Sequence, residues 1–356
     1  MPTLFLAGDV MLGRGVDQLF AHPSDPRLVE PWIHDAREYV RRVETRTGAI
    51  TRPVSPAYPW GELLDDMRSA DARIVNLETS ITSRGVPWPN KTVHYRMHPA
   101  NTGALEVARI NACALANNHV LDFGCDGLAD TVEALRSAGI ASCGAGRAQG
   151  EARAPAIVPL PSGRALVFSF GSTTSGIPAD WAALPDRAGV DLLPDLSIAT
   201  AERVAERMRT HARGGDVLIA SIHWGTNYGW EVGGELVAFA HALVDGGVDV
   251  VHGHSSHHPR RIERYRGKLV LYGCGDLLND YEALQPDDEF RVGLGLAYFA
   301  TIDSRGDLQR LRMRPLRVRR MRLVRTTMHD ARFLAERLGG VDVGKDGMLW
   351  LRARAE

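Results

Sequence analysis

A cluster of histidines in residues 250–259, V-V-H-G-H-S-S-H-H-P, carries the clearest potential for chemistry in the chain. The cluster contains four imidazoles, His252, His254, His257 and His258. A polar loop whose histidines form only local hydrogen bonds is the plainer explanation, but burying so many titratable rings after an apolar strand is costly unless they share a ligand. Because imidazole binds zinc, manganese and iron, we predict a divalent-metal site here, with Gly253 allowing a tight turn that aims His254 into a cleft.

Acidic residues follow two earlier predicted strands. Asp9 comes just after the apolar residues 3–7, and Glu78, with Asn76 beside it, follows residues 72–75. Open α/β sheets place ligand-binding groups at the carboxyl ends of their strands, so Asp9 is a candidate metal ligand and Glu78 repeats the same geometry. For Asp9 alone, a turn or helix-capping role explains the sequence equally well.

A third predicted strand, residues 112–115, runs into A-N-N-H-V-L-D-F-G at residues 116–124. Asn118 can offer a carbonyl oxygen to a metal. His119, followed three residues later by Asp122, fits an acid/base pair in which the carboxylate orients the ring. His223 likewise follows a predicted strand, residues 217–222, which consists of apolar or small residues.

Strands and helices alternate along the chain, with polar residues at the strand ends, and this pattern indicates an α/β enzyme. The other elements that we expect are helices near residues 30–45, 60–70, 99–107, 127–138, 198–212 and 234–245, a hairpin of residues 156–160 and 164–171, and strands at 268–272 and 294–302. Residues 310–325 alternate arginine with apolar residues. They predict an edge strand with a solvated basic face, in preference to a polyanion site.

Composition limits the class of protein. The chain has 356 residues and is 44% hydrophobic, which is enough for a sizeable core. Its 42 Lys and Arg residues nearly balance its 43 Asp and Glu residues, so no overall charge favours nucleic acid or an acidic membrane surface. We expect one domain over residues 1–356, with an insertion near residues 21–60 at the site mouth and a C-terminal β/helical extension from about residue 305.

The expected location is the cytoplasm. The first residues lack the charged and apolar regions of a signal peptide, and no apolar run of about 18 residues occurs. The four cysteines lack short paired spacings, as is typical of reduced, packed thiols. We therefore expect no membrane partner, no nucleic-acid partner and no nucleotide cofactor.

Five motifs, G-D-V-M-L-G-R, N-L-E-T-S, A-N-N-H-V-L-D-F-G, H-W-G and G-H-S-S-H-H-P, resemble in order and spacing the CapA family of poly-γ-glutamate capsule proteins, a branch of the calcineurin-like metallophosphoesterases. The resemblance covers about residues 3–300. It implies an α/β fold in the form of a four-layer α/β/β/α sandwich, with one or two divalent metals at the carboxyl ends of the strands. The metal ligands that it implies are Asp9, Glu78, Asn118, His223, His254 and His257, with Glu78 in the bridging position. His119 and Asp122 become the acid/base pair, and the metal can be manganese, zinc, iron, calcium or magnesium.

The chain departs from the wider phosphoesterase pattern at two places. The first strand normally carries Asp-x-His, but Met11 stands at the third position. The late motif is normally Gly-His-x-His, whereas here the second ring comes at His257 or His258. We therefore expect the first metal to be weak, absent or differently coordinated, which disfavours two-metal phosphoester hydrolysis.

Three functions are compatible with these motifs. A metal-dependent hydrolase would cleave a phosphoester or amide, related to poly-γ-glutamate metabolism. A peptide epimerase would invert the Cα centre of the C-terminal residue of a ribosomal precursor peptide by acid/base chemistry. The lasso peptide epimerases, which do this, are an offshoot of the family that the motifs resemble. A non-catalytic, metal-stabilised component of polymer export is the third. We favour the epimerase, because capsule-type members usually carry a membrane anchor or export signal and this chain shows neither.

The expected substrate is a peptide or a polyglutamate-like chain. His258 is the expected second proton carrier beside His119. The residues predicted to contact the substrate are Arg14, Trp88, Trp224 and Trp230. For each tryptophan, packing in the core or in a loop is the alternative.

Overall fold

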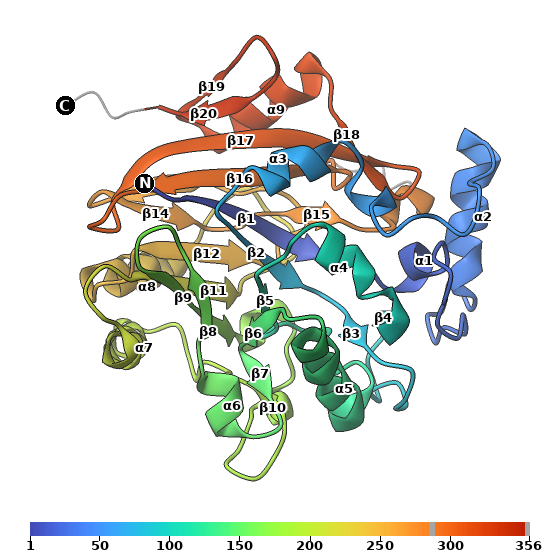
Figure 1. Ribbon diagram of the computed structural model, residues 1–356, viewed down its shortest axis with the longest axis horizontal. Helices are drawn as coiled ribbons and strands as arrows, with labels where there is room; N and C mark the ends of the chain where they lie inside the picture. Colours follow the sequence, from blue (N-terminus) through green and yellow to red (C-terminus); the bar gives the residue numbers. More distant parts are fainter. Residues whose placement is uncertain (285–288, 353–356) are drawn as a thin grey trace.

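The computed structural model describes residues 1–284 and 289–352. Two large β-sheets pack face to face, and helices cover their outer faces (Figure 1). The larger sheet has ten strands in the order β19-β20-β17-β16-β1-β2-β5-β6, with β15 beside β1 and β18 beside β17. The strands of this sheet are β1 (Thr3–Val10), β2 (Ala72–Leu77), β5 (Ala112–Ala114), β6 (Ala141–Cys143), β15 (Asp276–Leu278), β16 (Leu294–Ile302), β17 (Leu308–Arg319), β18 (Arg322–Arg325), β19 (Val341–Val343) and β20 (Leu349–Leu351).

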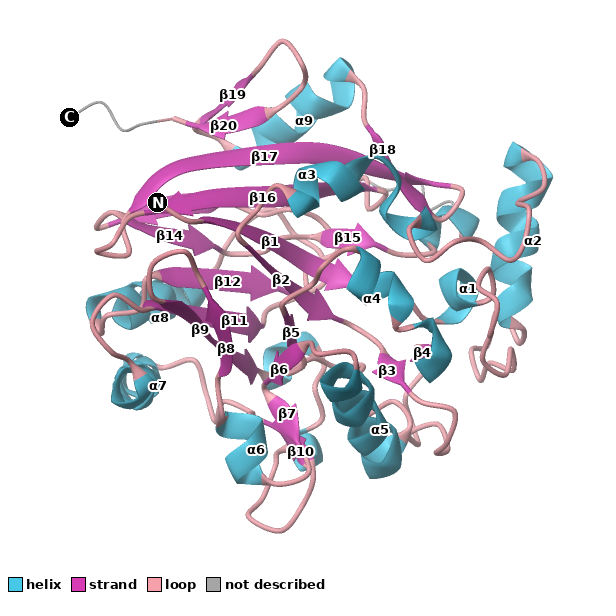
Figure 2. Ribbon diagram, viewed as in Figure 1, coloured by secondary structure: helices cyan, strands magenta, loops and turns pink. Residues whose placement is uncertain are grey.

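The second large sheet has six strands in the order β13-β14-β12-β11-β9-β8 (Figure 2). Its strands are β8 (Ala156–Pro159), β9 (Arg164–Gly171), β11 (Val217–His223), β12 (Val250–His254), β13 (Ile262–Tyr265) and β14 (Lys268–Leu271). Two short pairs lie outside the large sheets: β3 (Ser80–Ile81) with β4 (Arg96–Met97), and β7 (Ala145–Gly146) with β10 (Gly189–Val190).

Most of the helices are short. The α-helices are α1 (Arg14–Asp17), α2 (Ala36–Thr47), α3 (Leu64–Arg68), α4 (Gly103–Val107), α5 (Gly124–Ser137), α6 (Gln149–Arg153), α7 (Ile198–His211), α8 (Gly234–Asp245) and α9 (Met328–Leu338). Segments of 3-10 helix occur at Tyr58–Leu63, Pro99–Asn101, Thr173–Ser175, Ala179–Trp181 and Tyr281–Ala283. Among the described residues, no helix combines the length and the apolar character that crossing a bilayer requires.

Alternating side chains of the central strands build the layers, because successive residues of a strand point to opposite faces. Leu6 of β1 packs between the two sheets with Ile219 of β11. Phe5, one position earlier in β1, packs on the outer face in the cluster that includes residues of α3, α4 and α5. Leu218 of β11 packs on the opposite outer face with α7 and α8. The predicted α/β/β/α sandwich is confirmed.

Parallel pairing brings the functional strand ends to one edge of the sandwich. In the larger sheet β1 pairs in parallel with β2 and β15, and in the smaller sheet β11 pairs in parallel with β12. The two sheets are joined at this edge by a hydrogen bond of 2.9 Å between His252 Nε2 and the Ala7 carbonyl oxygen. The carboxyl ends of β1, β2, β11 and β12 therefore open into the same region.

The prediction of an edge strand for the basic residues 310–325 is wrong. They form β17 and β18, and β17 pairs with β16 on one side and with β18 and β20 on the other. Arg312 lies over the Phe299 ring, with its guanidinium carbon 4.4 Å from the ring centroid, and Arg314 pairs with Asp66 at 3.1 Å. The strand is internal because other strands pair along both of its edges, although Arg310, Arg317 and Arg319 remain exposed.

Two local predictions also need correction. The helix expected near residues 30–45 begins later, at Ala36, because the Asp35 side chain accepts a hydrogen bond from the Arg37 amide and caps the helix there. Cys113, Cys143 and Cys274 are buried free thiols as expected, but Cys125 is exposed in the first turn of α5.

Candidate metal and acid/base site

Backbone register aligns the strand-end side chains. Asp9 of β1 lies opposite Asn76 of β2 and opposite Asp276 of β15. His223, the last residue of β11, lies opposite His254, the last residue of β12. All five side chains are almost completely buried. The strand-end geometry that the sequence predicts for Asp9, His223 and His254 is therefore present.

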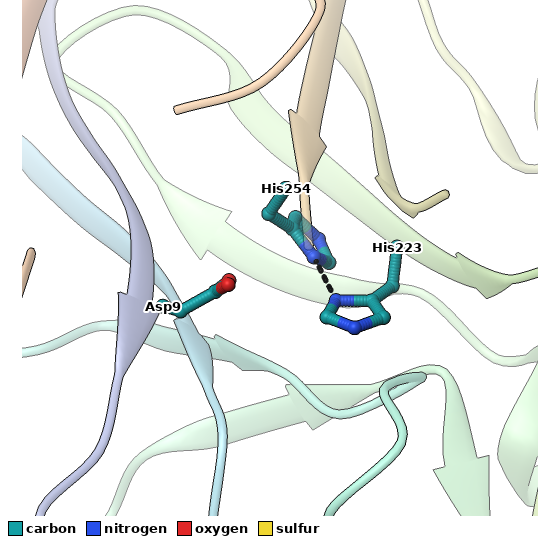
Figure 3. A group of neighbouring side chains, drawn as sticks. All are labelled: Asp9, His223 and His254. Carbon is teal, nitrogen blue, oxygen red and sulfur yellow. Dashed lines mark hydrogen bonds between the residues drawn. The ribbon is translucent and has the colours of Figure 1, made fainter. Parts of the chain in front are cut away.

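Asp9, His223 and His254 form a group that could hold a metal ion, with ligand atoms all within 4.8 Å of one another. Figure 3 shows the Asp9 carboxylate beside the two imidazoles, whose Nδ1 atoms lie 2.8 Å apart. Ser221 supports the group, because its hydroxyl lies 3.0 Å from His254 Nε2 and 3.0 Å from His252 Nδ1. His252 thus braces His254 and is not itself a member of the group.

The electrostatics of this group suit a cation. Burial lowers the pKa of His223 and of His254 well below the usual value, so both rings are neutral near pH 7 and keep a lone pair for a ligand bond. Burial, together with the nearby Asp276 carboxylate, raises the pKa of Asp9 to about 7. One Asp9 oxygen, Oδ2, is buried without a hydrogen-bond partner among the described residues. A divalent cation bound to this oxygen would satisfy it.

A second group with metal-ligand spacing shares Asp9 and adds His257 and Asp276. His257 Nδ1 lies 3.0 Å from Asp276 Oδ1, and Asn279 donates to the other Asp276 oxygen at 2.8 Å. Burial alone would lower the pKa of His257, but the Asp276 carboxylate, followed by that of Asp9, raises it above the usual value. Asp276, from a different strand, thus adds a second carboxylate beside Asp9.

Two amide side chains hold the acidic residues in place. Asn76 Nδ2 donates to Asp9 Oδ1 at 2.7 Å and to Glu78 Oε2 at 2.8 Å. Asn117 Nδ2 donates in turn to Asn76 Oδ1 at 2.9 Å. Burial, and then the charges of Asp9 and Asp276, raise the pKa of Glu78 well above its usual value. Glu78 lies outside both three-residue groups, but its carboxylate is 3.9 Å from His223 Nδ1.

His119 and Asp122 form the predicted pair. His119 Nδ1 lies 2.7 Å from Asp122 Oδ2, and Lys91 Nζ lies 2.7 Å from the other carboxylate oxygen. Burial lowers the pKa of His119 to about 4, although the Asp122 charge acts in the opposite direction. Its Nε2 atom lies 3.9 Å from Glu78 Oε1. The ring therefore stands beside the candidate metal residues as a neutral base held at one nitrogen.

A cleft of about 270 Å³ joins these groups. The predicted residues that line it are Glu78, Asn118, His119, His223 and His257. Asn118 Oδ1 lies 3.0 Å from His223 Nε2, so Asn118 orients that ring from the cleft side. The cleft is also lined by Lys91, Val93, Gly176, Asn227, Ser255 and Tyr281, which the sequence analysis does not single out.

Trp224 does not face the cleft, so its predicted role in substrate contact is wrong. Its side chain is buried in the core beneath α8, and its indole N–H donates to the Tyr272 carbonyl at 2.9 Å. Trp88 packs edge-on against Trp181, with ring centroids 5.3 Å apart, outside the lining of the cleft. A tryptophan that directly follows a buried strand continues the packing of that strand.

The prediction that Arg14 contacts the substrate is also wrong. Its guanidinium donates to Glu30 at 2.7 Å and to both oxygens of Asp280, and it lies between the rings of Tyr39 and Tyr95. The side chain is 1% exposed. Arg14 is the buried centre of an ion-pair network next to the site, with its donors already in use.

His258 is not positioned to carry a proton to a substrate. It is fully buried, its Nδ1 lies 3.1 Å from the Pro259 carbonyl oxygen, and its ring packs against Trp230 and Phe290 at centroid distances of 4.4 and 4.8 Å. Trp230, expected to contact the substrate, is committed to the same aromatic cluster. Neither residue lines the cleft.

Three residues of the candidate site were not predicted from the sequence, and two of them, Lys91 and Tyr281, have no local signal. Asp276 lies in G-D-L-L, where a glycine and an acid follow an apolar strand as they do at Asp9. This similarity to Gly8 and Asp9 in the first motif is a sequence signal that identifies Asp276 as a candidate site residue. Lys91 comes from the loop between β3 and β4, and Tyr281 from a 3-10 turn, where no periodicity marks a residue as functional.

The donor set fits a divalent cation. Neutral imidazoles and carboxylates from several strands converge. Burial and then the Asp276 charge raise the pKa of Asp9, and burial and then the charges of Asp9 and Asp276 raise that of Glu78, effects that a cation would relieve. A mixed nitrogen and oxygen set suits zinc, manganese or iron better than calcium or magnesium, which prefer oxygen ligands.

Comparison with known proteins identifies relatives. The family model described as "Bacterial capsule synthesis protein PGA_cap" matches residues 3–281. A probable polyglutamine synthesis accessory protein of Mycobacterium tuberculosis H37Rv is 49% identical over 337 residues, covering 93% of this chain and 89% of the relative. The capsule biosynthesis protein CapA of Bacillus anthracis is 23% identical over 78% of this chain, which spans 60% of that protein. A crystal structure of a 5'-nucleotidase precursor from Thermus thermophilus matches with a TM-score of 0.47 and 14% identity, over 89% of this chain and 54% of that one.

Proposed function

The chain belongs to the bacterial capsule synthesis protein family, and we propose that it is a metal-dependent enzyme that exchanges the Cα proton of a residue in a glutamate-containing peptide or polymer, and so epimerises that centre. The substrate class follows from the printed names of the relatives, which concern polyglutamine synthesis and capsule synthesis. The reaction type rests on the side chains of the cleft.

One observation carries the reaction type: two imidazoles line the same cleft, and each is anchored by a carboxylate through Nδ1. The distances are 2.7 Å from His119 to Asp122 and 3.0 Å from His257 to Asp276. A carboxylate at Nδ1 fixes the tautomer and orientation of an imidazole and leaves Nε2 for the substrate. Epimerisation needs two such groups, one to remove the proton and one to return it.

In the proposed reaction, one ring with a neutral Nε2 takes the Cα proton, and the electron pair of the broken C–H bond moves into the adjacent carbonyl. The other ring, protonated at Nε2, returns a proton to the opposite face of the carbon. A cation held by Asp9, His223 and His254 would supply positive charge that stabilises the negative charge developing on the carbonyl oxygen. Glu78 and Asn118 would orient the ligand set, and Lys91 would hold Asp122 in place.

Hydrolysis of an amide is the second candidate, and a specific observation favours it. The two three-residue groups share Asp9, as expected if two cations bind side by side, and pairs of cations are common in hydrolases. His257 would then be a metal ligand, and His119 alone would carry a proton. The number of metal ions per chain separates the two candidates.

The test is incubation of the protein, loaded with manganese or zinc, with γ-linked and α-linked glutamate oligomers in deuterium oxide. We expect mass spectrometry to show deuterium uptake without cleavage, and chiral analysis after acid hydrolysis to show mixed configuration. Cleavage without uptake would replace the proposal with hydrolysis. Absence of both deuterium uptake and cleavage would contradict an enzymatic role on these substrates.

A further inference from the structure

Ser255, the residue directly after His254, has an unusual backbone conformation. Its φ angle is +95°. The other non-glycine residues with positive φ in the described part of the chain lie between 47° and 60°, close to the small left-handed well that side chains tolerate. Ser255 alone lies well beyond this well, in a region that favours glycine. Strain of this kind persists only where the surroundings impose it, and it concentrates at functional sites.

The hydroxyl of Ser255 is also unsatisfied. The residue is 2% exposed, and its Oγ is buried without a hydrogen-bond partner in the part of the chain that the structure describes. Leaving a buried hydroxyl without a partner is unfavourable, and such groups in native structures call for an explanation. The neighbouring Ser256 is equally buried, but its Oγ donates to the His258 carbonyl at 2.9 Å. Burial in this loop therefore does not by itself leave a serine hydroxyl unpaired.

Ser255 lines the site cleft and stands in the chain between His254 and His257. It lines the cleft together with His257, Asn227 and Lys91. The Lys91 side chain, 15% exposed, also lines the cleft, and its ammonium already contacts Asp122 Oδ1 at 2.7 Å, the Val93 carbonyl oxygen at 2.8 Å and His119 Nδ1 at 3.0 Å. An anionic oxygen in this cleft would find an unpaired hydroxyl donor at Ser255, and hydrogen bonds to charged acceptors are stronger than those between neutral groups.

We propose that the Ser255 hydroxyl binds the substrate by donating a hydrogen bond to one of its carboxylate oxygens. This inference rests on the proposed function, because a glutamate-containing substrate supplies the carboxylate. Serine, and not glycine, occupies this glycine-like φ because its hydroxyl binds the ligand. The backbone strain at Ser255 and its unpaired hydroxyl are both unfavourable, and substrate binding by the hydroxyl explains both.

The test compares Ser255→Ala and Ser255→Gly with the matched control Ser256→Ala. Binding of γ-linked pentaglutamate to the metal-loaded protein is measured by titration calorimetry, a readout that does not require turnover. We expect both Ser255 variants to bind about ten- to a hundredfold more weakly, the loss typical of one hydrogen bond to a charged group. Ser256→Ala should bind as the wild type does. Ser255→Gly should also melt at a higher temperature than the wild type, because glycine removes the strain.

The possible failures are distinguishable. Wild-type affinity in both Ser255 variants, with metal content unchanged, would overturn the inference and leave the proposed function standing. Absence of binding by the wild type would overturn the glutamate substrate class, and with it both proposals. Loss of metal from Ser255→Ala would show that the hydroxyl supports the metal and not the substrate, which also overturns the inference.

Discussion

The Nδ1 atoms of His223 and His254 lie 2.8 Å apart, on rings carried by opposed residues of the parallel strands β11 and β12. The Asp9 carboxylate from the other sheet has an oxygen within 4.8 Å of the ligand atoms of both rings. Since burial keeps both rings neutral, the three side chains offer two nitrogen lone pairs and an oxygen at one point of the sandwich. The metal chemistry proposed here depends on this convergence.

Removing either ring should remove the metal. We expect His223→Ala and His254→Ala each to lower metal affinity by about a hundredfold or more, because even partners outside the ligand set typically contribute ten- to a hundredfold. Elemental analysis after dialysis measures the loss, and circular dichroism checks the fold. His241→Ala is the control, since that ring stacks on Tyr265 and contacts Glu263. Full metal content in either site variant would show that the ligand assignment is wrong.

Asp276 distinguishes one bound cation from two. If His257 is a proton carrier, Asp276→Asn should keep the metal content of the wild type and lower turnover, because the ring loses the carboxylate that anchors Nδ1 at 3.0 Å. If the Asp9, His257 and Asp276 group holds a second ion, the same variant should lose one ion per chain. Metal stoichiometry measured beside the rate decides between the two, and our account predicts unchanged stoichiometry.

Asp122→Asn tests whether the Asp122 carboxylate supports acid/base catalysis by His119. An amide can still accept a hydrogen bond from His119, but it cannot stabilise the protonated ring, so we expect kcat to fall by about a hundredfold with little change in KM. Asp130→Asn serves as the control, because Asp130 pairs with Arg84 on the surface of α5. A kcat equal to that of the wild type would reduce Asp122 to a structural role, such as accepting the Tyr95 amide at 2.6 Å.

Gly253→Ala should destabilise the fold. A Cβ at Gly253 would lie 2.6 Å from the carbonyl oxygens of Leu271 and Tyr272, which belong to the neighbouring chain segment. We expect a loss of about 1–3 kcal/mol in unfolding free energy, the usual effect of overpacking, measured by urea denaturation. Gly150→Ala in α6 is the control, because its Cβ would meet nothing within 4 Å. Equal stability of the two variants would contradict this account.

Gly253 also shows where reasoning from the sequence finds the right residue for the wrong reason. A glycine directly before a histidine predicts a tight turn, but Gly253 lies inside β12 and is absent from the positive-φ glycines of the described chain. Glycine is required there by the close approach of backbone oxygens. Such tertiary contacts leave no trace in local sequence patterns.

The layers and the strand-end ligands could be predicted, because hydrophobic periodicity marks the strands and parallel strands end at the same edge. Asp9, His223 and His254 followed from this rule. Asp276 was missed although its G-D-L-L motif repeats the glycine and acid of the first motif, because β15 is a strand of only three residues that pairs with β1. Trp224 and Arg14 were misassigned for the same kind of reason, since their partners Tyr272 and Asp280 lie far along the chain.

The most direct test of the central claim is deuterium uptake at Cα of a γ-linked glutamate oligomer by metal-loaded wild-type protein and by His119→Ala. Our account predicts uptake without cleavage in the wild type. In His119→Ala it predicts uptake reduced by about a hundred- to ten-thousandfold, the typical contribution of a positioned acid or base, with metal content retained. Equal uptake by the two proteins, or absence of uptake by the wild type while it cleaves the oligomer, would contradict the claim.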